Sequence, residues 1–314
     1  MSKPILTLTV NPAIDRIVSV DRLVFEDRAY IESTTEAAGG RGINAARVLA
    51  NFGAQAIAIT TSGHEGGRKF EEQLQNDGFG KEIVKIRNNI RTNLTISDRQ
   101  GLSVKMNERG PALSPTEEKR ILATVERLLP GASWLMLSGS LPPETDDRLY
   151  ANLIRLATEK QVKTLLDTDG DALLRGVEAQ PTIVKPNQSE AERLLNTVLI
   201  TRSQSIDAVL RIKNMGPRAV VLSLGSRGLI ASTPSEGVLE VAPPPVHVLS
   251  PIGAGDAMGA AIVWSLDRGD SFSEALRWGV AAGTASSMLP GINLAGLEQT
   301  RAIYPQTQVT RIVV

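Results

Sequence analysis

Cysteine is absent from this chain of 314 residues, and only two histidines, His64 and His247, are present. The lack of thiols excludes disulfides, zinc–thiolate sites, iron–sulfur clusters and cysteine nucleophiles. So few histidines argue against a Ser–His–Asp triad or a multi-histidine metal site. We interpret His247 as a structural or surface residue.

The chain also lacks an excess of charge of either sign and lacks long apolar runs. Lys and Arg number 34, as do Asp and Glu, which argues against a large nucleic-acid footprint or a polybasic membrane anchor. No apolar run approaches the roughly 18 residues of a membrane span, and the first residues lack a secretion-signal pattern. With 42% hydrophobic and 22% charged residues, we expect a folded cytoplasmic protein without a membrane or nucleic-acid partner.

Strand-like and helix-like runs alternate along most of the chain, which predicts an α/β fold with a mostly parallel sheet and helices on both faces. A capping box at Ser114-Pro115-Thr116-Glu117 predicts a helix start. Residues 14–36 and 90–110 are typical of exposed strands. We therefore predict one α/β domain over 1–314, with a small β-sheet lid formed by about 14–36 and 90–110. The expected strands are 5–10, 56–61, 134–138, 163–166, 182–185 and 219–224, and the expected helices are 43–52, 66–77, 146–159, 189–195, 206–215 and 257–266.

The loop Gly253-Ala254-Gly255-Asp256 precedes an apolar helix. Flexible glycines and a helix N-terminus together predict an anion site. No Walker motif occurs, and Gly259 comes one residue too late for a dinucleotide fingerprint, which weighs against an oxidoreductase. A base that deprotonates an attacking hydroxyl is the role that needs an anion site and a carboxylate together. The alternative is that Asp256 only starts the helix.

Six ordered motifs span essentially the whole chain, at 7–15, 38–47, 138–143, 184–190, 221–228 and 253–256. They resemble those of the ribokinase-like carbohydrate kinases, in the branch of phosphofructokinases and tagatose-6-phosphate kinases. Three further segments, 91–94, 241–246 and 279–283, are most similar to the minor 6-phosphofructokinases of bacteria. The sequence departs from the family pattern at Arg41, where lysine or glycine is usual, and at Pro251 and Ala257. These departures bear on the substrate rather than on the activity.

The resemblance implies a ribokinase-like three-layer fold and an ATP-dependent phosphosugar kinase. Asp256 would take the proton from the 1-hydroxyl of fructose 6-phosphate, which attacks the γ-phosphate of ATP to give fructose 1,6-bisphosphate and ADP. The N–H groups of Gly253, Ala254 and Gly255 would hold the developing charge. The implied substrate residues are Asp15, Gly39, Gly40, Asn44, Arg91, Ser140 and, reaching a partner subunit's site, Arg28. The implied nucleotide residues are Lys185, Asn187, Ser223, Gly225 and Gly228, and Glu190 is expected to contact Mg²⁺ through water.

Several of these residues have a plain structural alternative. Asp15 could be a turn residue, Asn44 a surface residue, Arg28 a solvated charge and Glu190 a helix-start residue. Asp167 could support the metal or cap a turn.

Other functions stay open. The motifs do not separate fructose 6-phosphate from fructose 1-phosphate or tagatose 6-phosphate as the substrate. A nucleoside or unphosphorylated-sugar kinase is a further alternative, as is a catalytically silent sugar-phosphate sensor, which an intact Asp256 disfavours. Exposed lid edges, together with the resemblance, predict a homodimer through the lid.

Overall fold

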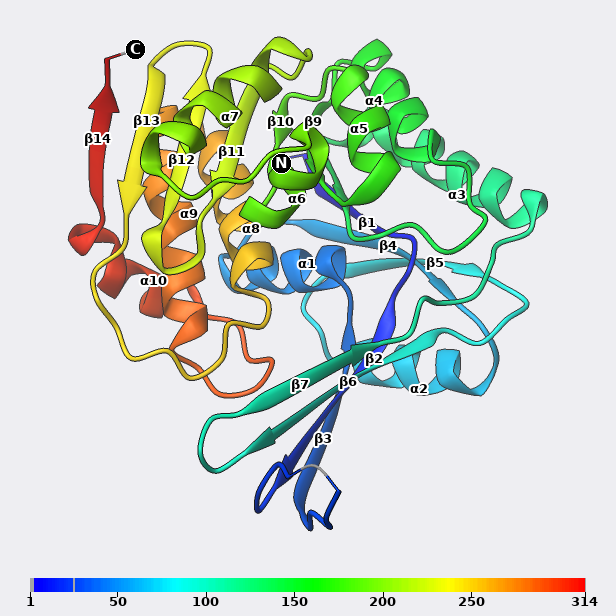
Figure 1. Cartoon of the computed structure of the whole chain (residues 1–314). Coiled ribbons are helices and arrows are strands. Elements are labelled where there is room, and N and C mark those ends of the chain that lie inside the picture. Colours follow the sequence, from blue (N-terminus) through cyan, green and yellow to red (C-terminus); the bar gives the residue numbers. More distant parts are fainter. Residues whose placement is uncertain (1–2, 25, 314) are drawn as a thin grey trace.

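The computed structural model describes residues 3–24 and 26–313, and its strands form two sheets (Figure 1). Phe25, within the predicted lid range 14–36, lies outside the described residues, as do residues 1–2 and 314 of the predicted domain. The larger sheet has ten strands in the order β14-β13-β12-β11-β10-β9-β8-β1-β4-β5. They are β1 (Ile5–Thr9), β4 (Ala56–Ser62), β5 (Gly80–Lys85), β8 (Trp134–Ser138), β9 (Lys163–Asp167), β10 (Ile183–Val184), β11 (Ala219–Ser223), β12 (Leu229–Thr233), β13 (Gly237–Ala242) and β14 (Gln308–Ile312).

Neighbouring strands run parallel from β5 to β11 and antiparallel from β11 to β14. Every residue of the central strands β1 and β8 is buried. Such continuous apolar strands need cover on both faces, because each strand directs side chains to both sides. The α/β class predicted from the sequence is confirmed.

Two layers of helices provide this cover (Figure 1). In one layer α3 to α7 pack in succession, and in the other α1, α8, α9 and α10 do so. Among the described residues, no helix combines the length and the apolar character needed to cross a membrane. The helices are α1 (Arg41–Asn51), α2 (His64–Leu74), α3 (Pro115–Leu128), α4 (Leu149–Glu159), α5 (Gly170–Glu178), α6 (Gln188–Leu195), α7 (Arg202–Asn214), α8 (Ala254–Asp267), α9 (Phe272–Ser287) and α10 (Leu297–Ile303).

The smaller sheet projects from the larger one at the lower side of Figure 1. Its strands are β2 (Ala13–Val20), β3 (Ile31–Gly39), β6 (Arg91–Asp98) and β7 (Ser103–Asn107), in the order β3-β2-β6-β7. β2 follows β1 after only three residues, so the chain passes directly from an interior strand of one sheet to an interior strand of the other. This junction brings the smaller sheet to the carboxyl end of β1, the edge at which ligands bind in parallel α/β sheets.

The predicted helix starts differ most from the structure at three helices, by about three or four residues. α4 starts at Leu149 instead of 146, because turns occupy the preceding residues. α7 starts at Arg202 instead of 206, after the capping box of Thr201 and Gln204. α8 starts at Ala254 instead of 257, so the glycine loop is itself the first helical turn.

Candidate active site

The first turn of α8 forms one wall of the site. Gly253 precedes the helix with φ +75°, a left-handed conformation that glycine adopts without strain. Asp256 is the third residue of the helix. The first N–H groups of a helix have no partners within it, so they point outward and favour an anion. An anion-binding helix end and a carboxylate therefore lie within one turn.

Asp256 is held by a residue from another helix. Asn44, on α1, donates from Nδ2 to Asp256 Oδ2 over 2.8 Å. Burial and the nearby charge of Asp167 raise the pKa of Asp256 to about 7, against lowering contributions from Asn44, Arg41 and Lys185. A carboxylate with this pKa is divided between its two protonation states near neutral pH, as suits a general base.

A buried ion-pair cluster lies beside this helix end. Lys185 Nζ contacts Asp167 Oδ2 at 2.8 Å, and both side chains are almost fully buried. Arg41 donates to Asp167 Oδ1 over 2.9 Å, to Glu190 Oε1 over 3.1 Å and to Asp169 Oδ2 over 3.4 Å. Burial raises the pKa of Asp167, but Lys185 and Arg41 outweigh it, so that this pKa is below its ordinary value. Removing Arg41 would leave the buried carboxylate of Glu190 without a cation, whereas Asp167 would keep Lys185 as its partner.

Glu190 caps α6. Its Oε2 accepts the backbone N–H of Asn187 over 2.9 Å, and its Oε1 accepts from Arg41. Burial is the main reason that its pKa is raised. Among the described residues, no group of three or more His, Cys, Asp or Glu side chains is arranged to hold a metal ion. With both oxygens engaged, the chemistry of Glu190 fits contact with Mg²⁺ through water, which this ion retains readily.

The smaller sheet supplies a second group of predicted residues. Asp15 on β2 lies opposite Asn93 on β6, and Asn93 Nδ2 donates to Asp15 Oδ1 over 2.8 Å. Burial raises the pKa of Asp15, while Asn93, Arg91 and Arg47 lower it. Gly39 on β3 leaves room for this carboxylate, because a Cβ there would lie 1.9 Å from Asp15 Oδ2.

Arg91 lies near this carboxylate, and Ser140 lies beside the short junction between β1 and β2. Arg91 is half-buried, and Asp15 is the first among the charges that act on it. Its Nη1 donates to the carbonyl of Glu108 over 3.0 Å. Ser140 Oγ accepts from Asn11 Nδ2 over 3.4 Å, and Asn11 lies in the junction between β1 and β2. A cation and hydroxyl- and carboxylate-bearing side chains thus converge where the two sheets meet.

A cavity of about 940 Å³ reaches the first turn of α8. Its walls come from the start of α6, the turn after β11, the proline-rich segment before α8, and α9. The polar side chains of Asn187, Gln188 and Arg193 line it at α6, whereas Met258 on α8 and Val280 on α9 are apolar. Of the predicted nucleotide residues, it is lined by Asn187, Ser223, Gly225 and Gly228.

The predicted residues do not all meet in one place. Ala254 and Gly255 line the cavity, whereas Lys185 and Glu190 lie in the adjoining ion-pair cluster. Arg28 is exposed in the loop that joins β2 to β3, at the far end of the smaller sheet (Figure 1). This chain alone does not bring Arg28 to the other site residues.

Sequence reasoning missed two residues of the site. Asn93 holds Asp15, and its position two residues after Arg91 on a strand could have placed both on one face. Arg41 was noted only as a departure from the family pattern. Its contacts join segments separated by more than 120 residues, so no local pattern could have indicated them.

The model of the pfkB family carbohydrate kinases matches residues 8–295. The chain is 32% identical to the ATP-dependent 6-phosphofructokinase isozyme 2 of Escherichia coli over 96% of its length and 97% of the relative. It is 27% identical to the 1-phosphofructokinase of Vibrio cholerae, over 99% of this chain and 98% of the relative. It is 28% identical to a tagatose-6-phosphate kinase of Staphylococcus epidermidis, over 98% of this chain and 100% of the relative.

Solved structures agree with this similarity. The crystal structure of phosphofructokinase-2 from Escherichia coli in complex with potassium superposes with a TM-score of 0.90, at 31% identity, over 97% of this chain and 99% of that one. Ribokinase from Arabidopsis thaliana, at 20% identity and a TM-score of 0.78 over 97% of this chain and 99% of that one, shows the shared fold alone. The ribokinase-like fold predicted from the sequence is confirmed.

Proposed function

This chain belongs to the pfkB family of carbohydrate kinases and is a phosphofructokinase-type sugar kinase, and we propose that its acceptor is the 1-hydroxyl of fructose 6-phosphate. The products would be fructose 1,6-bisphosphate and ADP. The observation that supports this acceptor is the 32% identity to the ATP-dependent 6-phosphofructokinase isozyme 2 of Escherichia coli. The pairing of Asp256, with a pKa of about 7, with the N-terminus of α8 supports the phosphoryl transfer itself.

Asp256 is the general base. Its carboxylate accepts the proton of the hydroxyl as the oxygen attacks the γ-phosphorus, and the bond from that phosphorus to the β–γ bridging oxygen breaks. Negative charge develops on the transferred group, and the first N–H groups of α8 stabilise it. Gly253, Ala254 and Gly255 are the residues of this anion hole.

The sugar phosphate lies at the junction of the two sheets. The Asp15 carboxylate, held by Asn93, accepts hydrogen bonds from sugar hydroxyls, and Gly39, Gly40 and Asn44 line the same space. The phosphate group carries about two negative charges, so it needs cationic and hydroxyl donors. Arg91 and Ser140 supply them, and a guanidinium can contact phosphate through two parallel hydrogen bonds.

ATP occupies the cavity of about 940 Å³ that ends at the first turn of α8. Its volume lies within the usual range for small-molecule sites, and its apolar walls suit a purine. Lys185 lies close to this turn, since a Cβ at Gly255 would be 3.7 Å from its Nζ. Bound Mg²⁺ would neutralise phosphate charge, with Glu190 contacting it through water.

A homodimer through the smaller sheet belongs to this proposal. Val104 and Met106 on β7 are 42% and 48% exposed. They lie opposite Ile96 and Leu94 on β6, so the four apolar side chains share one face of the smaller sheet. This face is opposite the one that carries Asp15. Pairing two such faces would bury apolar surface, and Arg28 at the exposed end could then reach the partner's site.

The acceptor is tested by measuring ADP release with MgATP and fructose 6-phosphate, fructose 1-phosphate or tagatose 6-phosphate in parallel. Phosphorus NMR of the products locates the new phosphate ester. The proposal expects the highest kcat/KM with fructose 6-phosphate. A higher kcat/KM with fructose 1-phosphate or tagatose 6-phosphate would contradict fructose 6-phosphate as the acceptor, but it would still agree with a phosphosugar kinase. Turnover of none of them would contradict the phosphosugar assignment, leaving unphosphorylated sugars, nucleosides or a silent sensor.

A further inference from the structure

A line of side chains runs from the surface to Asp256. Arg47 lies on α1, three residues after Asn44 and on the same face of the helix. Arg47 Nε donates to Asp77 Oδ2 over 3.1 Å, and Arg47 Nη1 donates to Asn44 Oδ1 over 3.3 Å. Asn44 Nδ2 then donates to Asp256 Oδ2 over 2.8 Å. Asp77, which follows α2, therefore connects to Asp256 through two intervening side chains.

The chemistry of these groups determines the orientation of the Asn44 amide. A guanidinium only donates hydrogen bonds, and an ionised carboxylate only accepts them. The amide oxygen must therefore face Arg47 and the amide nitrogen must face Asp256. The reversed amide would set donor against donor and acceptor against acceptor. Arg47 is in turn fixed by its contact with Asp77.

We propose that Arg47 is a positioning residue of the phosphoryl transfer: anchored by Asp77, it orients Asn44, which holds Asp256 toward the acceptor hydroxyl. This inference rests on the proposed function, because it assigns a role in the same reaction. Arg47 acts on Asp256 through Asn44, and its charge also lowers the pKa of Asp15.

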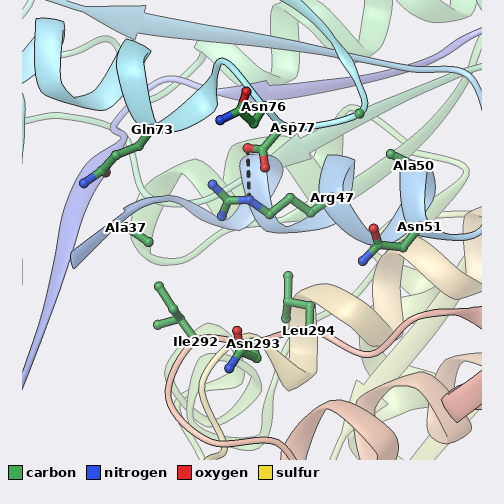
Figure 2. A pocket seen from close by; sticks show the side chains of 11 residues that line it. Ala37, Arg47, Ala50, Asn51, Gln73, Asn76, Asp77, Ile292, Asn293 and Leu294 are labelled. Carbon is green, nitrogen blue, oxygen red and sulfur yellow. Dashed lines mark hydrogen bonds and ion pairs between the residues drawn. The ribbon is translucent and has the colours of Figure 1, made fainter. Parts of the chain in front are cut away.

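Arg47 and Asp77 also line a pocket of about 410 Å³, which shares no lining residue with the cavity at α8 (Figure 2). In Figure 2 the Arg47 side chain extends along the pocket toward Asp77, with Ile292 and Leu294 on the opposite side. The pocket opens to the surface beside Asn51, Asn76 and Asn293, which are exposed. A small planar cation could therefore reach the place of the guanidinium if the side chain were shortened.

Loss of Arg47 changes the titration of Asp256 in a defined direction. The hydrogen bond from Asn44 lowers the pKa of Asp256, as do the charges of Arg41 and Lys185, while Asp167 raises it. Without Arg47 the amide is free to turn away, so the lowering contribution of Asn44 is lost. The pKa of Asp256 then rises, and a higher pH is needed to ionise the base.

The experiment compares the full-length wild-type protein with Arg47→Ala, using MgATP and whichever phosphosugar the wild type phosphorylates. We expect kcat to fall about tenfold to a hundredfold, as for a lost hydrogen bond to a charged group, with the KM for ATP little changed. The acid limb of the kcat profile should move to higher pH. Guanidinium at a few tens of millimolar should partly restore kcat.

Two further variants serve as controls. Arg202→Ala removes a surface ion pair with Glu240, 2.6 Å long, between α7 and β13, and should leave kcat and the acid limb unchanged. Arg47→Lys keeps the charge and loses the planar fork, so a smaller shift in the same direction is expected. If Arg47→Ala does not fold, Arg47→Lys replaces it in the comparison with the wild type.

Wild-type values of kcat and of the acid limb in the Arg47 variants would overturn the inference. A loss of kcat with an unmoved acid limb and no rescue by guanidinium would overturn it too, because a structural role alone produces that result. If the wild type phosphorylates none of the sugars, the proposed function fails, but the role of Arg47 can still be tested without turnover. The test is then a ¹³C NMR titration of the Asp256 carboxyl group, whose signal is assigned by its loss in Asp256→Asn. The inference requires a higher titration midpoint in Arg47→Ala than in the wild type, and equal midpoints would reject the role of Arg47.

Discussion

At the scale of single residues, the behaviour of Asp256 follows from two opposing influences. Burial and Asp167 disfavour its charged form, whereas Asn44, Arg41 and Lys185 favour it. The balance leaves the carboxyl poised near neutral pH, where it can both accept a proton and release it to water. A carboxylate exposed on a helix start would titrate far lower and would be a weaker base.

The first prediction concerns pH. A base works only when ionised, so kcat/KM should fall as pH drops through the pKa of Asp256, which is about 7. One pH unit below this value, activity should be about a tenth of the plateau. Initial rates over pH 5.5 to 9 with saturating MgATP measure this limb. A profile that stays flat down to pH 5 would contradict the assignment of Asp256 as the base.

The second prediction concerns Arg91. Arg91→Gln should raise the KM for fructose 6-phosphate about tenfold to a hundredfold, because the phosphate loses a charged donor. The KM for ATP should change little. Unphosphorylated fructose serves as the control acceptor, since its weaker turnover should be the same in both proteins. An equal loss with both sugars would instead indicate a general defect of the site.

At the scale of elements, most strands and helices could be predicted, because their signals are local. The capping box of Ser114 and Glu117 was visible in four residues, and α3 begins there. For the first turn of α8 the sequence predicts a loop, because glycine disfavours helix in general, and only the folded structure shows Gly255 within a helix. The links from Arg41 and Arg47 to distant segments depend on tertiary packing, which no local pattern encodes.

The third prediction concerns how β3 supports β2. Gly39→Ala would place a Cβ 1.9 Å from Asp15 Oδ2, so the carboxylate must leave its position beside Asn93. We expect the KM for the sugar phosphate to rise at least about tenfold, with kcat less affected, since hydrogen bonds to the sugar are lost. Gly131→Ala is the matched control, because nothing lies within 4 Å of a Cβ there. Similar KM values for both variants would argue against a substrate role for Asp15.

At the scale of the whole molecule, the two sheets carry different parts of the candidate site. The larger sheet holds the ion-pair cluster and the cavity, and the smaller sheet carries Asp15, Asn93 and Arg91. The short connection from β1 to β2 holds the two sheets next to each other. The candidate site forms where the sheets meet, which explains why its residues come from nearly the whole chain.

The fourth prediction concerns assembly. Light scattering at micromolar concentration should give twice the mass of one chain. Val104→Glu combined with Met106→Glu should give the mass of one chain, because charges would replace the apolar contact. Ile200→Glu, at a side chain 76% exposed between α6 and α7, is the control that should remain a dimer. A single-chain mass for the wild type would contradict the dimer.

The measurement that tests the central claim most directly compares wild type with Asp256→Asn in ATP-dependent phosphorylation of fructose 6-phosphate. The amide keeps the size of the side chain but cannot accept the proton, so kcat should fall about a hundredfold to ten-thousandfold. Calorimetry should show both substrates still binding, and thermal unfolding should show the fold intact. A variant that retains wild-type kcat would contradict the account.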